Sequence, residues 1–164
     1  MDKSIRPAAV AGTFYPAQSG QLVPMLDELL LPYADYAQGG PVEAVTACAY
    51  IVPHAGYVYS GPTAAAAYGR MKGQFLNPRV VLFGPAHYHY FRGLAVPSVT
   101  HFATPLGPVA LDTQLIKRLV DHEGLVYSDQ AHQPEHSLEV QLPFLQRTFD
   151  SFTLVPILVG DASA

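Results

Sequence analysis

Two of the seven histidines stand where a ligand-binding residue is expected in an α/β protein. His54 follows the apolar run 44–52, and His87 follows the apolar run 79–83, each after a turn that contains proline. Ligands of open α/β sheets bind outside the carboxyl ends of the strands, so the two side chains would meet if these strands are neighbours. Because imidazole is a common metal ligand, we predict His54 and His87 as metal ligands. Hydrogen-bonded loop residues are the alternative interpretation.

A third polar group contains two carboxylates, an imidazole and a hydroxyl within residues 135–139. Ser137 is expected to cap a helix that follows it, and Glu139 to interact with the positive end of that helix. This structural explanation does not account for Glu135 or His136. We predict these two as catalytic residues that act as general acid or base, or else as partners that orient a metal-bound histidine.

Amphipathic segments alternate with apolar runs along the chain, and the spacing of apolar residues predicts the elements that position these groups. We predict helices over 19–31, 63–71, 112–124 and 137–149, and strands over 44–52, 79–83, 94–99 and 152–159. The last helix is ambiguous, because its apolar residues also alternate as in a strand and Pro143 would kink it or mark its start. The alternation predicts an α/β fold with a largely parallel or mixed central sheet flanked by helices.

The composition argues against several classes of protein. The chain has 164 residues, which fits one domain, and its nine Lys and Arg form no basic run, so we expect no nucleic-acid partner. Cys48 is the only cysteine and is predicted to be buried. One cysteine permits no internal disulfide, and no apolar stretch suits a signal peptide or a membrane span. We therefore expect a cytoplasmic protein that does not enter a membrane.

Four motifs, in order, resemble those of the Memo family, whose microbial members are described as protein B of the AmmeMemoRadiSam system. The resemblance runs through essentially the whole chain. The motifs are Ile-Arg-Pro-Ala-Ala-Val-Ala-Gly-Thr-Phe-Tyr-Pro at 5–16, Pro-His-Ala-Gly-Tyr-Val-Tyr-Ser-Gly at 53–61, Gly-Pro-Ala-His at 84–87 and Glu-His-Ser-Leu-Glu-Val-Gln-Leu-Pro at 135–143.

The resemblance implies a fold similar to that of class III extradiol dioxygenases, which use non-haem iron. In the family, the histidines that match His54 and His87 are metal ligands. Iron and copper are the metals discussed for the family, and redox activity is proposed for it. The resemblance also implies a functional link to a radical-SAM protein.

The chain departs from the family pattern because it lacks two later motifs, an Asp-containing Ser-Ser-Asp-x-x-His motif and a Cys-Gly motif whose cysteine completes the metal site. We therefore expect residues 1–164 to be the N-terminal portion of a single Memo-like domain with an incomplete site. A sheet cut after the strand 152–159 would expose an edge or an apolar face, which predicts a homo-oligomer or exchanged elements.

Three functions remain open at the level of the sequence. The first is a metal-dependent oxidoreductase with dioxygenase-like chemistry. The second is a non-catalytic binding or regulatory protein that uses the same cleft for a peptide or a partner, which the low charged fraction of 13% mildly favours because it suits an extensive interface. The third is a metal-handling protein. We expect a small molecule or a peptide as the occupant of the cleft.

Overall fold

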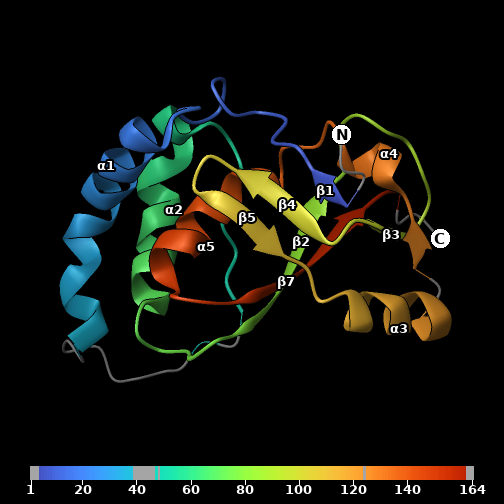
Figure 1. Cartoon of the computed structure of the whole chain (residues 1–164). Helices are drawn as coiled ribbons and strands as arrows, with labels where there is room; N and C mark the ends of the chain where they lie inside the picture. The colour runs from blue at the N-terminus through green and yellow to red at the C-terminus, as the bar shows by residue number, and fades with distance from the viewer. Residues whose placement is uncertain (1–3, 39–46, 48, 124, 162–164) are drawn as a thin grey trace.

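The chain forms an α/β structure with two mixed sheets flanked by helices, which confirms the predicted fold class (Figure 1). The structure is a computed structural model that describes residues 4–38, 47, 49–123 and 125–161. Within these residues, no helix has both the length and the apolar character needed to cross a membrane.

The larger sheet has the strand order β2-β7-β3-β6. β2 (Arg79–Pro85) and β7 (Thr153–Val159) run parallel and in register along their whole length. β3 (Leu94–Val96) is antiparallel to β7 and parallel to β6 (Val126–Tyr127). β7 lies inside the sheet and is buried from Leu154 to Leu158, as its continuous apolar sequence predicts. The carboxyl end of β2, next to β7, leads directly to His87.

The smaller sheet joins the N-terminal segment to a hairpin. β1 (Ile5–Arg6) pairs parallel with β4 (His101–Thr104), which pairs antiparallel with β5 (Gly107–Ala110). Gly107 has a φ of 113°, a backbone conformation that glycine adopts without steric cost. The sequence did not predict this hairpin, because its short strands mix polar residues, proline and glycine and carry little periodic signal. The predicted strand over 94–99 ends at Val96.

The helices largely follow the predicted segments. They are α1 (Ser19–Leu30) with its 3₁₀ extension η1 (Leu31–Gln38), α2 (Tyr57–Met71), α3 (Thr113–Glu123), α4 (Asp129–His132), the 3₁₀ turn η2 (Glu139–Gln141) and α5 (Leu142–Thr148). α1, α2 and α5 pack against one another (Figure 1). Their contact is apolar, with Leu22, Leu26, Tyr68 and Phe144 fully buried and the rings of Tyr68 and Phe144 stacked 5.0 Å apart.

Two local predictions are wrong. The helix over 137–149 begins only at Leu142, so Ser137 is not its N-cap. Pro143 lies in the first turn, which confirms the alternative that this proline marks the start of the helix. Ser137 instead donates a hydrogen bond from its hydroxyl to the carbonyl of Pro85. The run 44–52 forms no strand in its described residues, 47 and 49–52, and Ile51 is fully exposed. Residues 44–46 and Cys48, which we predicted to be buried, lie outside the described residues.

Candidate metal centre

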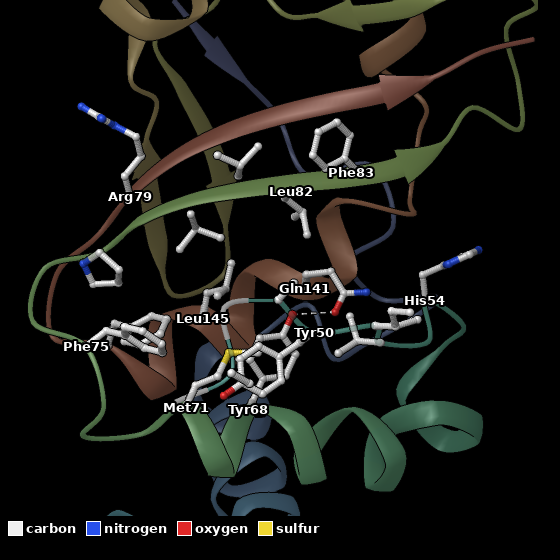
Figure 2. A pocket seen from close by; sticks show the side chains of 18 of the residues that line it. Tyr50, His54, Tyr68, Met71, Phe75, Arg79, Leu82, Phe83, Gln141 and Leu145 are labelled. Carbon is white, nitrogen blue, oxygen red and sulfur yellow. Dashed lines mark hydrogen bonds between the residues drawn. The ribbon is translucent and has the colours of Figure 1, made fainter. Parts of the chain in front are cut away.

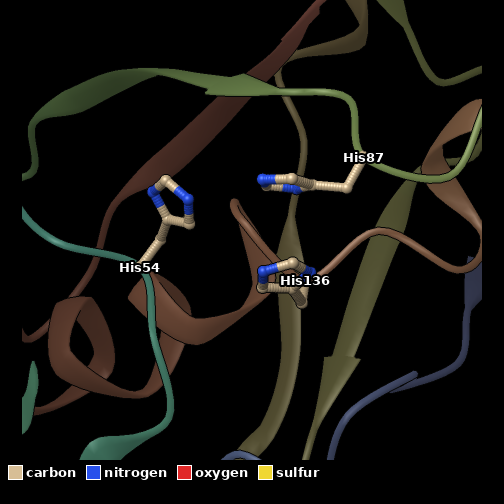
Figure 3. A group of neighbouring side chains, drawn as sticks. All are labelled: His54, His87 and His136. Carbon is tan, nitrogen blue, oxygen red and sulfur yellow. The ribbon is translucent and has the colours of Figure 1, made fainter. Parts of the chain in front are cut away.

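Three histidines from distant parts of the sequence meet beyond the carboxyl end of β2 (Figure 3). His54, His87 and His136 each offer a ring nitrogen within 4.8 Å of those of the other two. The rings of His87 and His136 stack with centroids 4.5 Å apart, and the His54 ring lies 5.3 Å from that of His87. Three imidazoles with room for a further ligand are a common metal-binding set, so this group could hold a metal ion.

A close approach of two backbone segments brings His87 to His136. β2 ends beside the turn 135–138, and a Cβ on Gly84 would lie 2.6 Å from the hydroxyl of Ser137. Only glycine fits this approach without shifting the side chains of Ser137 and Leu138. The hydrogen bond from Ser137 to Pro85, 2.9 Å long, closes the same contact. The Gly-Pro-Ala-His motif therefore positions its histidine partly through the absence of a side chain at Gly84.

Glu135 binds His87 at two points. Its Oε2 accepts the backbone N–H of His87 at 2.6 Å, and its Oε1 lies 2.9 Å from Nδ1 of the same residue. Oε1 also accepts the backbone N–H groups of His136 and Ser137. The carboxylate is buried, with 2% exposure, and both oxygens are occupied. This geometry favours a role in orienting His87 over proton transfer to a substrate.

His136 lies between an aromatic ring and the other histidines. Phe14 packs against it, with ring centroids 4.7 Å apart, and this contact comes from the N-terminal motif. Nδ1 of His136 lies 3.3 Å from Oε1 of Glu135, but without the geometry of a hydrogen bond, and it is buried with no hydrogen-bond partner. A buried polar atom of this kind is uncommon and leaves the ring available to a ligand.

His54 is held through the backbone that precedes it. Gln141 donates from Nε2 to the carbonyl of Pro53 at 3.0 Å and accepts from the Tyr68 hydroxyl at 2.8 Å (Figure 2). α2 starts three residues after His54, and its Tyr57 N–H donates to the carbonyl of Phe14. The amide of Gln141 thus connects the core to the turn that presents His54.

The electrostatic surroundings favour neutral imidazoles at two of the three positions. Burial lowers the pKa of His54, and the nearby His87 lowers it further. Burial also lowers the pKa of His136. Glu135 acts in the opposite direction and raises this pKa, but the nearby His87 and His54 lower it and offset part of that effect. Burial alone would raise the pKa of Glu135, but hydrogen bonds from His87 and Ser137 bring it below the usual value. An ionised carboxylate beside neutral imidazoles suits metal binding, because a metal ion needs the deprotonated nitrogen.

A second buried carboxylate, Glu139, has no contact with the three rings and connects the N-terminal motif to the site. It forms a 2.6 Å ion pair with Arg6 and accepts hydrogen bonds from the backbone of Ala9 and Val10 and the hydroxyl of Tyr15. Arg6 also donates to the backbone carbonyl of Glu135. The sequence placed Glu139 at a helix start and assigned no role to Arg6. Their separation of 133 positions gives no local signal for this pair.

The remaining histidines lie outside the cluster of three. His132 is buried in α4 with Nε2 3.1 Å from the carbonyl oxygen of Ala95. Tyr57 is buried against Phe144 and Tyr59 is exposed. The ring of Tyr88 packs edge-on against the rings of His87 and His136, with centroids 6.3 Å and 5.8 Å away.

An apolar cavity of about 610 Å³ borders the histidine cluster at His54 (Figure 2). It lies between β2, the extended residues 49–54 and the helices α2 and α5, and Leu82, Leu145 and Phe149 line it. Arg79 lies at the opposite end of β2 from His87, where its guanidinium pairs with Asp112 at 2.6 Å.

Comparisons with known proteins identify the family of the chain. Residues 6–164 match the sequence model of a family described as Memo-like protein. The chain is 41% identical over 160 residues to a MEMO1 family protein of Ignicoccus hospitalis, which covers 94% of the chain and 56% of that relative. A MEMO1 family protein of Aquifex aeolicus is 40% identical over 156 residues, covering 94% of the chain and 55% of the relative. The chain therefore spans about half the length of the curated relatives it matches.

Proposed function

We propose that this chain, which belongs to the Memo-like protein family, binds one iron or copper ion between His54, His87 and His136 and takes part in redox chemistry on a small molecule. The observation that carries the proposal is the convergence of three imidazoles from separate segments within 4.8 Å. Family membership alone would not identify His136 as a ligand of the ion.

The donor set of the site fits a metal ion. Because the ionised Glu135 can only accept, Nδ1 of His87 donates to it, and Nε2 of His87 keeps its lone pair for an ion. The lowered pKa values of His54 and His136 keep these rings neutral at physiological pH. The unpartnered Nδ1 of His136 supports a ligand at that ring, in preference to the acid or base role predicted from the sequence.

The class of metal follows from the ligands. Imidazole suits iron, copper, zinc and nickel, and the resemblance to class III extradiol dioxygenases favours a redox metal. A bound iron or copper ion would supply electron exchange with a substrate or with dioxygen. Around it, His87 and Glu135 would hold the ion's position, and Phe14 would exclude water from one side of His136. The His87 side chain is 37% exposed, which leaves a path for a small molecule to the site.

Metal analysis tests the proposal directly. The purified chain is loaded separately with Fe²⁺, Cu²⁺ and Zn²⁺, desalted, and analysed for metal per chain. We expect close to one ion per chain for iron or copper, and a loss of most of it in His54→Ala, His87→Ala and His136→Ala. His122→Ala, at an exposed position of α3, is the matched control and should keep the ion. Equal metal content in all of these proteins would refute the metal centre.

Oxygen uptake with catechols as probes then tests the redox role. Turnover that disappears together with the metal in the His87→Ala variant would support an enzyme. A chain that binds metal but consumes no oxygen would favour the other two functions, binding of a partner in the cleft or metal handling.

A further inference from the structure

The outer side of β2 is apolar and is left exposed by the part of the chain that the structure describes. Val81 is 46% exposed and Phe83 is 59% exposed, while the alternating residues Val80 and Leu82 pack against the core. β2 is an edge strand, since β7 is its only ladder partner among the described residues. The strand predicted over 152–159 became β7, inside the sheet, so the exposed edge belongs to β2.

β2 lacks the usual protection of an edge strand. Its seven residues pair with β7 without a bulge, and the charged Arg79 and the proline Pro85 stand only at its two ends, so residues 80–83 contain neither a charge nor a proline. Native edge strands are commonly short, twisted by bulges or interrupted by charge, because a flat apolar edge binds other chains. β6, at the other edge of the same sheet, has only two residues and follows the usual rule. The uncovered edge of β2 is thus a specific feature of this strand.

The cavity beside β2 adds a second, independent observation. Its volume of about 610 Å³ lies between β2 and the extended residues 49–54, so the two segments do not pair with each other (Figure 2). Most of its lining is apolar, including Leu145 and Phe149. An occupant must therefore provide backbone groups for the β2 edge and apolar side chains for the cavity.

We propose that a polypeptide segment occupies this place, and that it corresponds to the part of Memo-family chains outside the stretch that this chain matches. The matched stretch is only 56% of the Ignicoccus relative, so such a segment exists in the family. It adds a strand at β2 and inserts apolar side chains beside Leu82. A small molecule would fill the cavity but leave the β2 backbone unpaired. A second copy joined edge to edge would pair the backbone but leave the cavity unfilled.

The segment would lie directly beside the candidate metal centre, because His54 lines the same cavity. Its binding would cover Val81 and Phe83 and confine the extended residues 49–54. This inference does not depend on a bound metal, since both observations concern apolar and backbone groups.

Co-expression tests the inference. The full 164-residue chain is produced together with the residues of the Ignicoccus relative that lie outside the match, and the product is examined by native mass spectrometry and hydrogen–deuterium exchange. We expect a complex of one chain with one segment, and exchange at the β2 amides slowed by about tenfold or more relative to the chain alone. If the isolated segment is insoluble, a single-chain fusion of the two parts provides the same exchange measurement.

Two matched variants locate the contact. Val81→Lys should weaken the complex by about tenfold or more, because it places a charge against apolar side chains. Val126→Lys changes a valine of nearly equal exposure, 48% against 46%, on the opposite edge of the same sheet and should leave binding unchanged. The inference is overturned by unprotected β2 amides, by equal effects of the two variants, or by a β2-paired homodimer that excludes the segment.

Discussion

Glu135 accepts the backbone N–H of His87 at 2.6 Å and holds the Nδ1 of the same residue at 2.9 Å. One carboxylate thereby sets both the position of the histidine and its tautomer. The proton resides on Nδ1, facing Glu135, and Nε2 carries the lone pair. This relationship makes Glu135 a positioning residue, and it leads to the first prediction.

Replacing Glu135 with glutamine should weaken metal binding by about 10-fold to 100-fold, because the amide cannot accept hydrogen bonds at both positions. Competition titration with a chelator of known affinity measures the change. Glu139→Gln is the control, since Glu139 is equally buried but does not contact His87. A Glu135→Gln protein with the affinity of the unaltered chain would show that the carboxylate does not orient the ligand.

The pair of Arg6 and Glu139 should stabilise the fold without a direct part in metal binding. Arg6→Met leaves the buried carboxylate without its cation, and the free energy of unfolding should fall by about 3–5 kcal/mol. Urea denaturation measures this loss. The double variant Arg6→Met/Glu139→Gln should recover part of it, because the uncompensated charge is gone. A double variant as unstable as the sum of the two single variants would contradict coupling between them.

Gly84→Ala should destabilise the protein by about 1–3 kcal/mol, because the added Cβ overlaps the Ser137 hydroxyl and forces the turn 135–138 away from β2. Thermal unfolding measures the effect, and the same variant should bind metal more weakly. Gly20→Ala in α1 is the control, and its expected effect on stability has the opposite sign. Its Cβ meets no atom within 4 Å, so the greater helix propensity of alanine should raise stability slightly. Equal stability of the two variants would argue against the close approach at Gly84.

The buried His132 should make stability depend on pH. Burial lowers its pKa to about 4, and the nearby Arg6 adds to this shift, so the folded protein binds fewer protons at this ring than the unfolded chain. The contribution of His132 to the free energy of unfolding is therefore fully present above pH 6.5. It is lost as the pH falls towards 4, by about 3 kcal/mol.

Urea denaturation from pH 7 to pH 4 checks this sign for the unaltered chain and for His132→Gln, whose stability should fall less steeply. NMR titration of the His132 ring provides a direct reading. A midpoint near 6.5 would show that the ring is exposed to solvent in the folded state.

Local patterns in the sequence were sufficient to predict several features of the structure. The apolar runs 79–83 and 152–159 predicted the two longest strands. Only β7 is buried along its length, as an uninterrupted apolar run suggests, whereas β2 leaves Val81 and Phe83 exposed. The turns that follow apolar runs singled out His54 and His87. The same reasoning failed for the described residues of the run 44–52, because an apolar run forms a strand only where it pairs with a neighbouring strand.

By itself, the sequence determined the family, the α/β class and the histidines that reach the end of the sheet, because each depends on residues close together in the chain. Only the tertiary structure decided that His136 joins His54 and His87, that Glu135 orients His87, and that β2 is left as the open edge. These features depend on contacts between residues tens of positions apart. Packing, burial and strand order set such contacts, and the local spacing of residues along the chain does not predict them.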